Sequence, residues 1–259
     1  RRDPRRARVP LAVVTGGSSG IGAAVARALR RRGWELVLLA RGEERLRPLA
    51  EELRAEWELC DVGDRDAVGR IAAAVVERHP RVSLLVNNAG VPGRGTFLRS
   101  TPERIDEVTR TNYLGGVWCL RAFLPALEAA APSDVVNVVS VAGTVAAGSG
   151  GPYTASKHAQ LAFSRSISAE LRPRGVRVHT ILPGFVETEG FPQRKRFGAR
   201  LGTLVVEPEL VAERVLAAIE HDRAEVFVPR WYRIAPLAQA LAPRLVRKVA
   251  GRGIRPAGD

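Results

Sequence analysis

Seven short, nearly continuous apolar runs alternate along the chain with stretches of helical period. The runs are expected to form strands at residues 9–15, 35–40, 58–60, 82–86, 135–139, 176–182 and 225–228. Strands that are apolar at almost every residue are typical of strands buried on both faces. Because strands and helices alternate, we expect parallel βαβ units with right-handed crossovers. The sequence therefore predicts an α/β fold, a doubly wound parallel sheet of about seven strands with helices on both faces.

The helical stretches lie at 21–31, 43–55, 65–79, 102–130, 152–171 and 207–220. A chain of 259 residues, 46% of them hydrophobic, suits one large domain. No uncharged apolar run of about 18 residues occurs, and the basic start breaks into glycines too soon for a signal peptide. We expect a basic tail at 1–8, one α/β domain at 9–229, and a basic amphipathic extension at 230–259.

The net charge of +13 lies mostly at the two ends. Residues 1–8 carry +4 and residues 230–259 carry +6, which leaves +3 for the span between them. This distribution argues against a nucleic-acid groove on the domain. The two cysteines, Cys60 and Cys119, show no disulfide or metal-ligand spacing. We therefore predict no metal site and expect a reducing cytoplasm.

A glycine-rich turn separates the first expected strand from the first helix. Gly16, Gly20 and Gly22 let the backbone turn tightly and approach a pyrophosphate, and the helix N-terminus offers free N–H groups to the phosphates. A turn of this kind at the first strand–helix junction indicates a Rossmann-type dinucleotide site.

The residue after the second strand bears on which dinucleotide binds. A site for NAD usually has an acid there, whereas this chain has Arg41. An arginine attracts a 2′-phosphate, so we expect NADP in preference to NAD, with Ser18 adding a hydroxyl contact. The alternative is that Arg41 is a surface charge. Asp61, after the third strand, either accepts from the adenine amino group or caps the coming turn. Residues 87–90 either let a ligand pass close to the backbone or form a plain turn.

Tyr153 and Lys157 are four residues apart at the start of an expected helix, so they share one helix face. A fixed cation favours the phenolate and lowers the pKa of a nearby tyrosine, which makes the pair suited to proton transfer. A Tyr and a Lys at this spacing are, on their own, more often a solvated helix face.

In combination these motifs resemble the classical short-chain dehydrogenase/reductase family, and the resemblance covers residues 9–229. It rests on the Gly16, Gly20 and Gly22 turn, Asp61, residues 87–90, Asn112, Ser140, Tyr153, Lys157 and residues 183–188, all in family order. The resemblance implies that residues 9–229 form a dinucleotide-binding and catalytic domain. The protein would be an NAD(P)-dependent oxidoreductase that transfers a hydride between the cofactor and a carbonyl/alcohol substrate.

The resemblance also implies the role of each catalytic residue. Ser140 polarises the carbonyl, Tyr153 is the acid/base, and Lys157 binds the nicotinamide ribose and lowers the pKa of Tyr153. Asn112 holds a water that links Lys157 to solvent, and Thr188 lies near the carboxamide. The implied cofactor-binding residues are Gly16, Ser18, Ser19, Gly20, Ile21, Gly22, Arg41, Asp61, Val62, Asn88, Ala89, Gly90, Tyr153, Lys157, Pro183, Gly184, Val186 and Thr188.

Two segments outside these motifs bear on substrate and partners. Residues 190–204 resemble the segment that covers the substrate, and their basic side chains, Arg194 among them, either meet an anionic substrate or line a solvated loop. In the extension, apolar residues at helical spacing are flanked by arginines, with Pro236 and Pro243 expected to break it into short helices. Such a segment lies on an anionic membrane surface, covers the substrate mouth or contacts another subunit.

The sequence leaves two functions to compare. The first is an NADP-dependent oxidoreductase acting on a small carbonyl or alcohol, working as a homodimer or homotetramer paired through the helices at 102–130 and 152–172. The second is a nucleotide-binding protein with vestigial catalysis, recruited to a membrane by its basic ends. The presence of Ser140, Tyr153 and Lys157 together favours the first. The expected location is the cytoplasm, with peripheral membrane contact left open.

Overall fold

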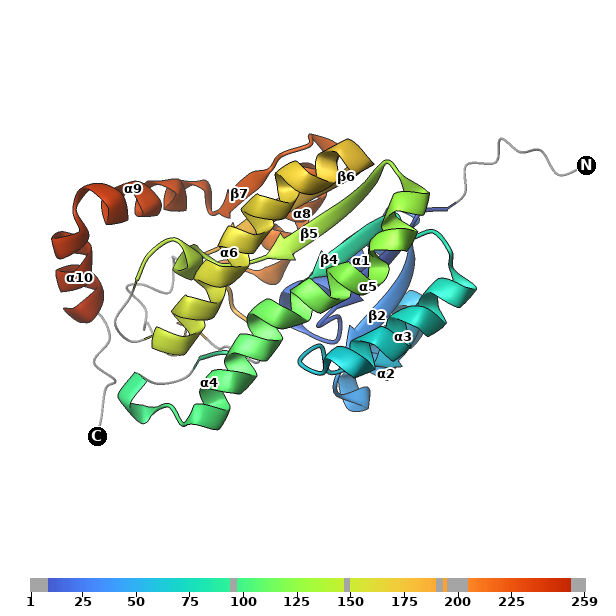
Figure 1. Ribbon diagram of the computed structural model, residues 1–259, viewed down its shortest axis with the longest axis horizontal. Coiled ribbons are helices and arrows are strands. Elements are labelled where there is room, and N and C mark those ends of the chain that lie inside the picture. The colour runs from blue at the N-terminus through green and yellow to red at the C-terminus, as the bar shows by residue number, and fades with distance from the viewer. Residues whose placement is uncertain (1–8, 94–96, 147–149, 190–192, 195–204, 253–259) are drawn as a thin grey trace, which may run out of the picture.

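The fold is a seven-stranded parallel sheet between two layers of helices (Figure 1), as predicted. This computed structural model describes residues 9–93, 97–146, 150–189, 193–194 and 205–252. The strand order is β3-β2-β1-β4-β5-β6-β7, and every pairing is parallel. The strands are β1 (Leu11–Thr15), β2 (Glu35–Ala40), β3 (Glu56–Leu59), β4 (Leu84–Asn87), β5 (Ser133–Val138), β6 (Val176–Pro183) and β7 (Glu225–Val228). The order reverses between β1 and β4, the place where ligands bind in open α/β sheets.

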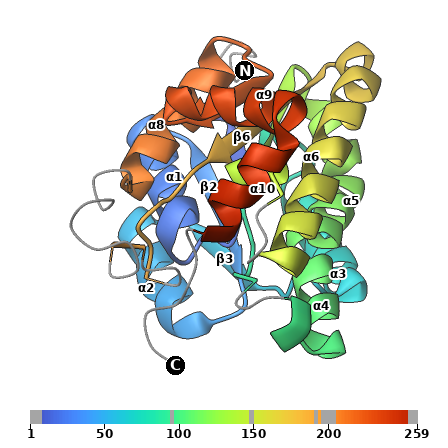
Figure 2. The same ribbon diagram turned by 90° about the vertical axis from the view of Figure 1, so that its left-hand side faces the viewer.

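The helices form one layer on each face of the sheet (Figure 2). One face is covered by α1 (Gly20–Arg31), α2 (Glu43–Leu53) and α8 (Pro208–Glu220). The other is covered by α3 (Arg65–Arg78), α5 (Gly115–Ala130) and α6 (Gly151–Leu171). A short helix, α4 (Pro102–Thr109), leads into α5.

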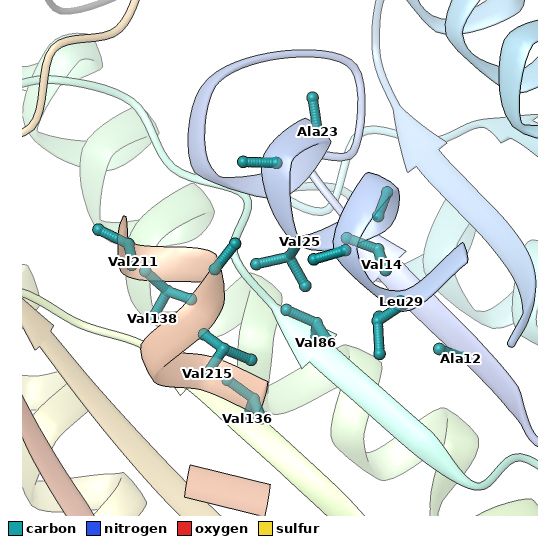
Figure 3. Close-up of a cluster of buried hydrophobic side chains, with 14 of the residues drawn as sticks. Ala12, Val14, Ala23, Val25, Leu29, Val86, Val136, Val138, Val211 and Val215 are labelled. Atoms are coloured by element: carbon teal, nitrogen blue, oxygen red, sulfur yellow. The ribbon is translucent and has the colours of Figure 1, made fainter. Parts of the chain in front are cut away.

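Each buried strand supplies side chains to both layers. In β1, Ala12 and Val14 pack toward α1 and α8, together with Val86 of β4 (Figure 3). Leu11 and Val13 belong to the core beneath α3 and α5. Successive side chains of a strand point to opposite faces, so a strand covered on both sides has to be apolar at every position. The burial of β1 on both faces therefore confirms the reason for which continuous apolar runs were predicted to be strands of this sheet.

The single helix expected at residues 102–130 is wrong in detail. The structure has α4, then one π-helical turn at Arg110–Leu114, and then α5. A π turn adds one residue to the helical circuit, and the apolar period of the sequence does not reveal it. Some strand bounds also differ from the expected ones by one or two residues. For example, β3 begins at Glu56 and β4 ends at Asn87.

The C-terminal extension is helical and lies over the carboxyl edge of the sheet. It consists of a 3₁₀ turn at Arg230–Arg233, then α9 (Ile234–Leu241) and α10 (Pro243–Arg252) (Figure 2). The break at Pro243 is confirmed, but the break expected at Pro236 is wrong, because Pro236 falls in the first turn of α9, where proline is tolerated. Among the described residues, no helix combines the length and apolar character needed to span a membrane. The tail at 1–8 lies outside the described residues.

Candidate active site

The glycine-rich turn leaves no space for side chains. Gly16 and Gly20 have φ angles of +63° and +54°, a region that favours glycine. A Cβ on Gly16 would lie 2.8 Å from Cα of Ala89, and one on Gly22 would lie 2.2 Å from the carbonyl oxygen of Gly16. The chain therefore closes on itself here, and the start of α1 follows at once. Ser19, the N-cap of α1, makes no side-chain capping bond.

Two polar side chains hold this turn against the end of β4. The Thr15 hydroxyl donates to the Val86 carbonyl at 3.2 Å and accepts from the backbone N–H groups of Asn88 and Ala89 at 3.0 and 3.1 Å. The Asn88 side-chain amide donates to the carbonyls of Thr15 and Gly16 at 3.1 and 3.2 Å. Residues 87–90 therefore do more than turn the chain, because they set the shape of the glycine-rich turn beside them.

Tyr153 and Ser140 meet beyond the carboxyl end of β5. Tyr153 is the third residue of α6, and its phenol is close enough to the Ser140 side chain for that group to lower its pKa. The Ser140 hydroxyl accepts from Ala142 N at 3.1 Å and donates to the Pro183 carbonyl at 3.4 Å. Gly93 lies against the tyrosine, since a Cβ there would be 2.3 Å from Cβ of Tyr153. Burial raises the pKa of Tyr153, and the Ser140 side chain lowers that pKa by less.

Lys157 is buried one turn further along α6. Its ammonium donates to Oε1 of Gln160 at 2.8 Å and to the Val138 carbonyl at 3.2 Å. Its Nζ is 5.8 Å from the centre of the Tyr153 ring. Burial lowers the pKa of Lys157 to about 7. In the unliganded chain the expected lowering of the Tyr153 pKa is therefore not seen, because burial outweighs it and the ammonium is directed toward Gln160.

These residues share one edge of the sheet, and comparison with known proteins decides the family. A family profile described as short chain dehydrogenase matches residues 10–197, well over half of the chain. The chain belongs to the short-chain dehydrogenase family. The family is one of oxidoreductases that act on small molecules.

Relatives of this short-chain dehydrogenase include reductases and cofactor complexes. A Streptomyces coelicolor protein provisionally named a ketoacyl reductase is 33% identical over 254 residues, covering 94% of this chain and 97% of the relative. A structure of a variant of the actinorhodin polyketide ketoreductase with NADPH has 32% identity and a TM-score of 0.77, covering 85% and 95% of the two chains. A Burkholderia cenocepacia short-chain dehydrogenase in complex with NADP has 28% identity and a TM-score of 0.80, covering 96% and 98%.

In this short-chain dehydrogenase, Arg41 lies between two carboxylates. Its Nη1 is 3.9 Å from Oδ2 of Asp61 and 3.7 Å from Oε1 of Glu107, and all three side chains are partly exposed. The other oxygen of Asp61 accepts from Gly63 N at 2.8 Å, so Asp61 caps the turn after β3, one of its two expected roles. Val62 beside it is buried against Gly115 at the start of α5.

Asn112 lies in the π turn and is almost fully buried. Its side-chain oxygen accepts from Val91 N at 2.7 Å, and its amide donates to the Val91 carbonyl at 3.1 Å and to the Ser156 hydroxyl at 3.2 Å. Ser156 in turn donates to the Tyr153 carbonyl at 2.8 Å. The side chain therefore ties the loop after β4 to α6. Both hydrogens of the Asn112 amide are used within the protein, and its side-chain oxygen keeps one acceptor site beyond the bond from Val91.

The segment after β6 runs from Ser140 to the glycine-rich turn. Pro183 ends β6, and Gly184 N donates to the Val228 carbonyl at 2.8 Å. Val186 is buried, and Thr188 packs on Gly20, where a Cβ would lie 3.0 Å from its methyl group. A Cβ on Gly184 would lie 2.0 Å from the Tyr232 ring, so the C-terminal extension packs directly on this segment.

The residues present fit a dinucleotide. The glycine backbone packs on neighbouring segments without side chains in the way, and the start of α1 has no side-chain cap, so its N-terminal N–H groups suit a pyrophosphate. The cavity of about 760 Å³ beside Ser18 and Ser19 reaches α2 and the start of α8 and is lined by six glutamates, so it is not part of this fit. Arg194 does not project freely, because it pairs with Glu207. Residues 190–192 and 195–204, the rest of the expected substrate cover, lie outside the described residues.

Four contributors were not identified from the sequence. Thr15 reads only as the last residue of a strand, and Gln160 as one polar residue of a helix. Glu107 reaches Arg41 from α4, and Tyr232 reaches Gly184 from the extension. The helix start beside Pro152 and the strand ends were readable because they follow from local pattern. Thr15, Glu107 and Tyr232 depend on contacts between distant segments, and Gln160 depends on which side of α6 is buried.

Proposed function

We propose that this short-chain dehydrogenase reduces the carbonyl group of a small molecule with NADPH. The observation that carries the proposal is the placement of Tyr153 beside Ser140, with the buried Lys157 one turn away. The pair lies at the sheet edge that also carries the glycine-rich turn. A proton donor and a nucleotide cradle at one edge suit hydride transfer coupled to protonation.

The chain's own residues would hold the substrate and supply the proton. Because burial raises the pKa of Tyr153, its phenol is protonated at neutral pH, as a donor to a carbonyl oxygen must be. The Ser140 hydroxyl would donate to the same oxygen and stabilise the charge that develops there. Lys157 would bind the ribose hydroxyls, and the start of α1 would bind the pyrophosphate. Bound NADPH would supply the hydride.

The relatives support both the direction and the cofactor of the proposal. The Streptomyces coelicolor relative is provisionally named for reduction of a ketoacyl group, and the solved ketoreductase was determined with NADPH. An NAD site usually has an acid after the second strand. This chain has Arg41 there, which supports the choice of NADPH over NADH. We further propose a homodimer or homotetramer paired through α5 and α6.

The test compares Tyr153→Phe with Tyr113→Phe on a panel of ketones with NADPH. Tyr113 is a matched control, since it lies in the π turn and its ring packs edge-on against Phe163. Loss of a general acid lowers the rate by roughly 10²–10⁴-fold, so we expect kcat/KM to fall by that factor for Tyr153→Phe alone. If wild type reduces ketones and Tyr153→Phe does so equally well, the acid role of Tyr153 is wrong. If wild type binds NADPH and reduces none, vestigial catalysis is the better description.

A further inference from the structure

The C-terminal extension turns its apolar side outward. In α9, Ile234, Leu237 and Leu241 follow each other at helical spacing, and their side chains are 63%, 61% and 85% exposed. A surface helix normally packs such a stripe on the core. Here the inward side carries Gln239 instead, whose Oε1 accepts from Ala146 N at 3.3 Å. Packing within the described chain therefore does not account for the apolar stripe.

The stripe is part of a larger exposed apolar patch, and the start of the extension packs on the domain. Trp231, 46% exposed, stacks on Tyr232 with ring centres 3.8 Å apart, and Tyr232 packs on Gly184. Leu245 of α10 is 60% exposed. Among the described residues, these five supply half of the ten large hydrophobic side chains that are exposed. We call Trp231, Ile234, Leu237, Leu241 and Leu245 the extension patch.

The charge around the extension patch is of one sign. Residues 230–252 contain five arginines and one lysine, and neither Asp nor Glu. Among them Arg230, Arg233, Arg244 and Lys248 are described and exposed, and none forms a salt bridge with another described residue. Elsewhere many arginines are paired, as Arg165 is with Glu225 and Arg172 with Asp222. Exposed positive charge with no acidic residue in the same segment therefore lies beside the exposed apolar side chains.

We propose that the extension patch and its flanking cations seat the protein on the surface of an anionic lipid bilayer. Such a surface offers an apolar interior for the leucines, an interfacial zone for Trp231 and negative headgroups for the cations. A second copy of this chain would bring two segments of the same positive charge together, which disfavours a symmetric contact. The proposal does not depend on the reaction catalysed.

Bilayer docking would also orient the active site. Because α9 and α10 lie over the carboxyl edge of the sheet, this edge would face the lipid (Figure 2). Two further exposed apolar residues, Phe97 and Leu98, follow β4 at the same edge, and Phe97 lies against Gly151 at the start of α6. The mouth of the site would then open toward the bilayer surface.

The test is flotation of the full chain with vesicles of phosphatidylcholine, alone or with about one third phosphatidylglycerol, at about 0.1 M salt, where charges act over roughly 10 Å. We expect the protein to float with the anionic vesicles, and raising the salt to about 0.5 M should reduce the bound fraction. Leu241→Glu should lower the partition coefficient at least tenfold. Val9→Glu is the matched control, because Val9 is an exposed apolar residue just before β1, at the opposite edge. It should not change the coefficient.

A second pair of variants tests the charges. The double variant Arg233→Gln/Arg244→Gln should bind anionic vesicles more weakly, and its binding should depend less on salt. The control is the double variant Arg31→Gln/Arg70→Gln, on α1 and α3, which should leave both quantities unchanged. Equal flotation of wild type and Leu241→Glu would overturn the proposal, as would failure to bind either kind of vesicle. A mass in solution that Leu241→Glu halves, without vesicle binding by wild type, would assign the patch to a second copy instead. NADPH binding by each variant confirms that it is folded.

Discussion

At the scale of the residue, the least favourable feature of this site is a buried ammonium. Lys157 gives up most of its hydration for two hydrogen bonds, to Gln160 and to the Val138 carbonyl, and burial lowers its pKa to about 7. The pKa of a lysine side chain in solution is about 10.4. The folded and unfolded chains therefore bind different numbers of protons between these two values.

This difference predicts how stability depends on pH. Below pH 7 the lysine is charged in both states, and its burial destabilises the fold in full. As the pH rises toward 10.4 the folded chain has lost this proton while the unfolded chain has not, so stability rises, by at most about 1.4 kcal/mol per pH unit. Melting of the cofactor-free protein between pH 6 and 9.5 should show wild type gaining stability relative to Lys157→Met. A difference that is constant with pH would contradict the lowered pKa.

We assign the proposed cofactor preference to Arg41, whose neighbouring carboxylates affect how strongly it can bind a 2′-phosphate. Its guanidinium is already 3.7 Å from Glu107, so a 2′-phosphate would compete with a carboxylate for it. A hydrogen bond to a charged group contributes about 1.5–3 kcal/mol, so Arg41→Asp should weaken NADPH binding about 10- to 100-fold and leave NADH binding much less affected. Arg47→Asp, on α2 with its own partners Glu43 and Glu51, is the control. Tryptophan fluorescence titration measures both. Equal losses for the two cofactors would make Arg41 a surface charge.

Residue types were readable from the sequence, but residue partners were not. The spacing of Tyr153 and Lys157 predicted a shared helix face, and both do lie on the inner side of α6. That the ammonium would turn to Gln160, only three residues further on, required knowing which side of the helix is buried. That Glu107 would meet Arg41 required the path of the chain over the 65 residues between them.

At the scale of the element, the site depends on strand ends that are fastened to one another. Thr15 on β1 and Asn88 after β4 form the link, and Asn112 in the π turn forms a second one to the loop after β4. The alternation of strands and helices predicted which strand ends would meet, because parallel strands end at a common edge. The π turn at Arg110–Leu114 escaped prediction, since one inserted residue leaves the apolar period almost unchanged.

The first link can be tested with an isosteric change. Thr15→Val removes the hydroxyl that accepts from two backbone N–H groups, so we expect a loss of about 1–3 kcal/mol of unfolding free energy and weaker NADPH binding. Thr109→Val is the control, because its hydroxyl donates only to the Ile105 carbonyl one turn back in α4. Urea denaturation and NADPH titration report the two effects. Equal stability losses in the two variants would show that the Thr15 link contributes little.

At the scale of the whole molecule, assembly is predicted to use the helices next to the active site. Along α6, Ala155, Ala162, Ser166 and Ala169 are small and exposed and recur at helical spacing, which would let a second copy approach closely. Ala162→Glu should therefore reduce the mass measured by light scattering to that of a smaller assembly. Ala73→Glu, an exposed alanine on α3, should not change it. A monomeric wild-type protein would make the predicted oligomer wrong.

The architecture of the domain followed from pattern, whereas the placement of the extension did not. Continuous apolar runs are recognisable because two covered faces demand them. The extension was identified as amphipathic and basic, and its alternatives were membrane, substrate mouth and subunit contact. Nothing in its composition indicates that Tyr232 packs on Gly184 or that Gln239 faces inward. Those contacts depend on the shape of the surface that the rest of the chain provides.

The fastening of the glycine-rich turn also affects the thermodynamics of ligand binding. Thr15 and Asn88 hold the turn in shape in the chain without a ligand. The conformational entropy of ordering that loop is thus lost during folding and is absent from the binding step. The heat capacity change on dinucleotide binding should then reflect only the surface that the ligand covers, without the extra contribution that accompanies coupled folding.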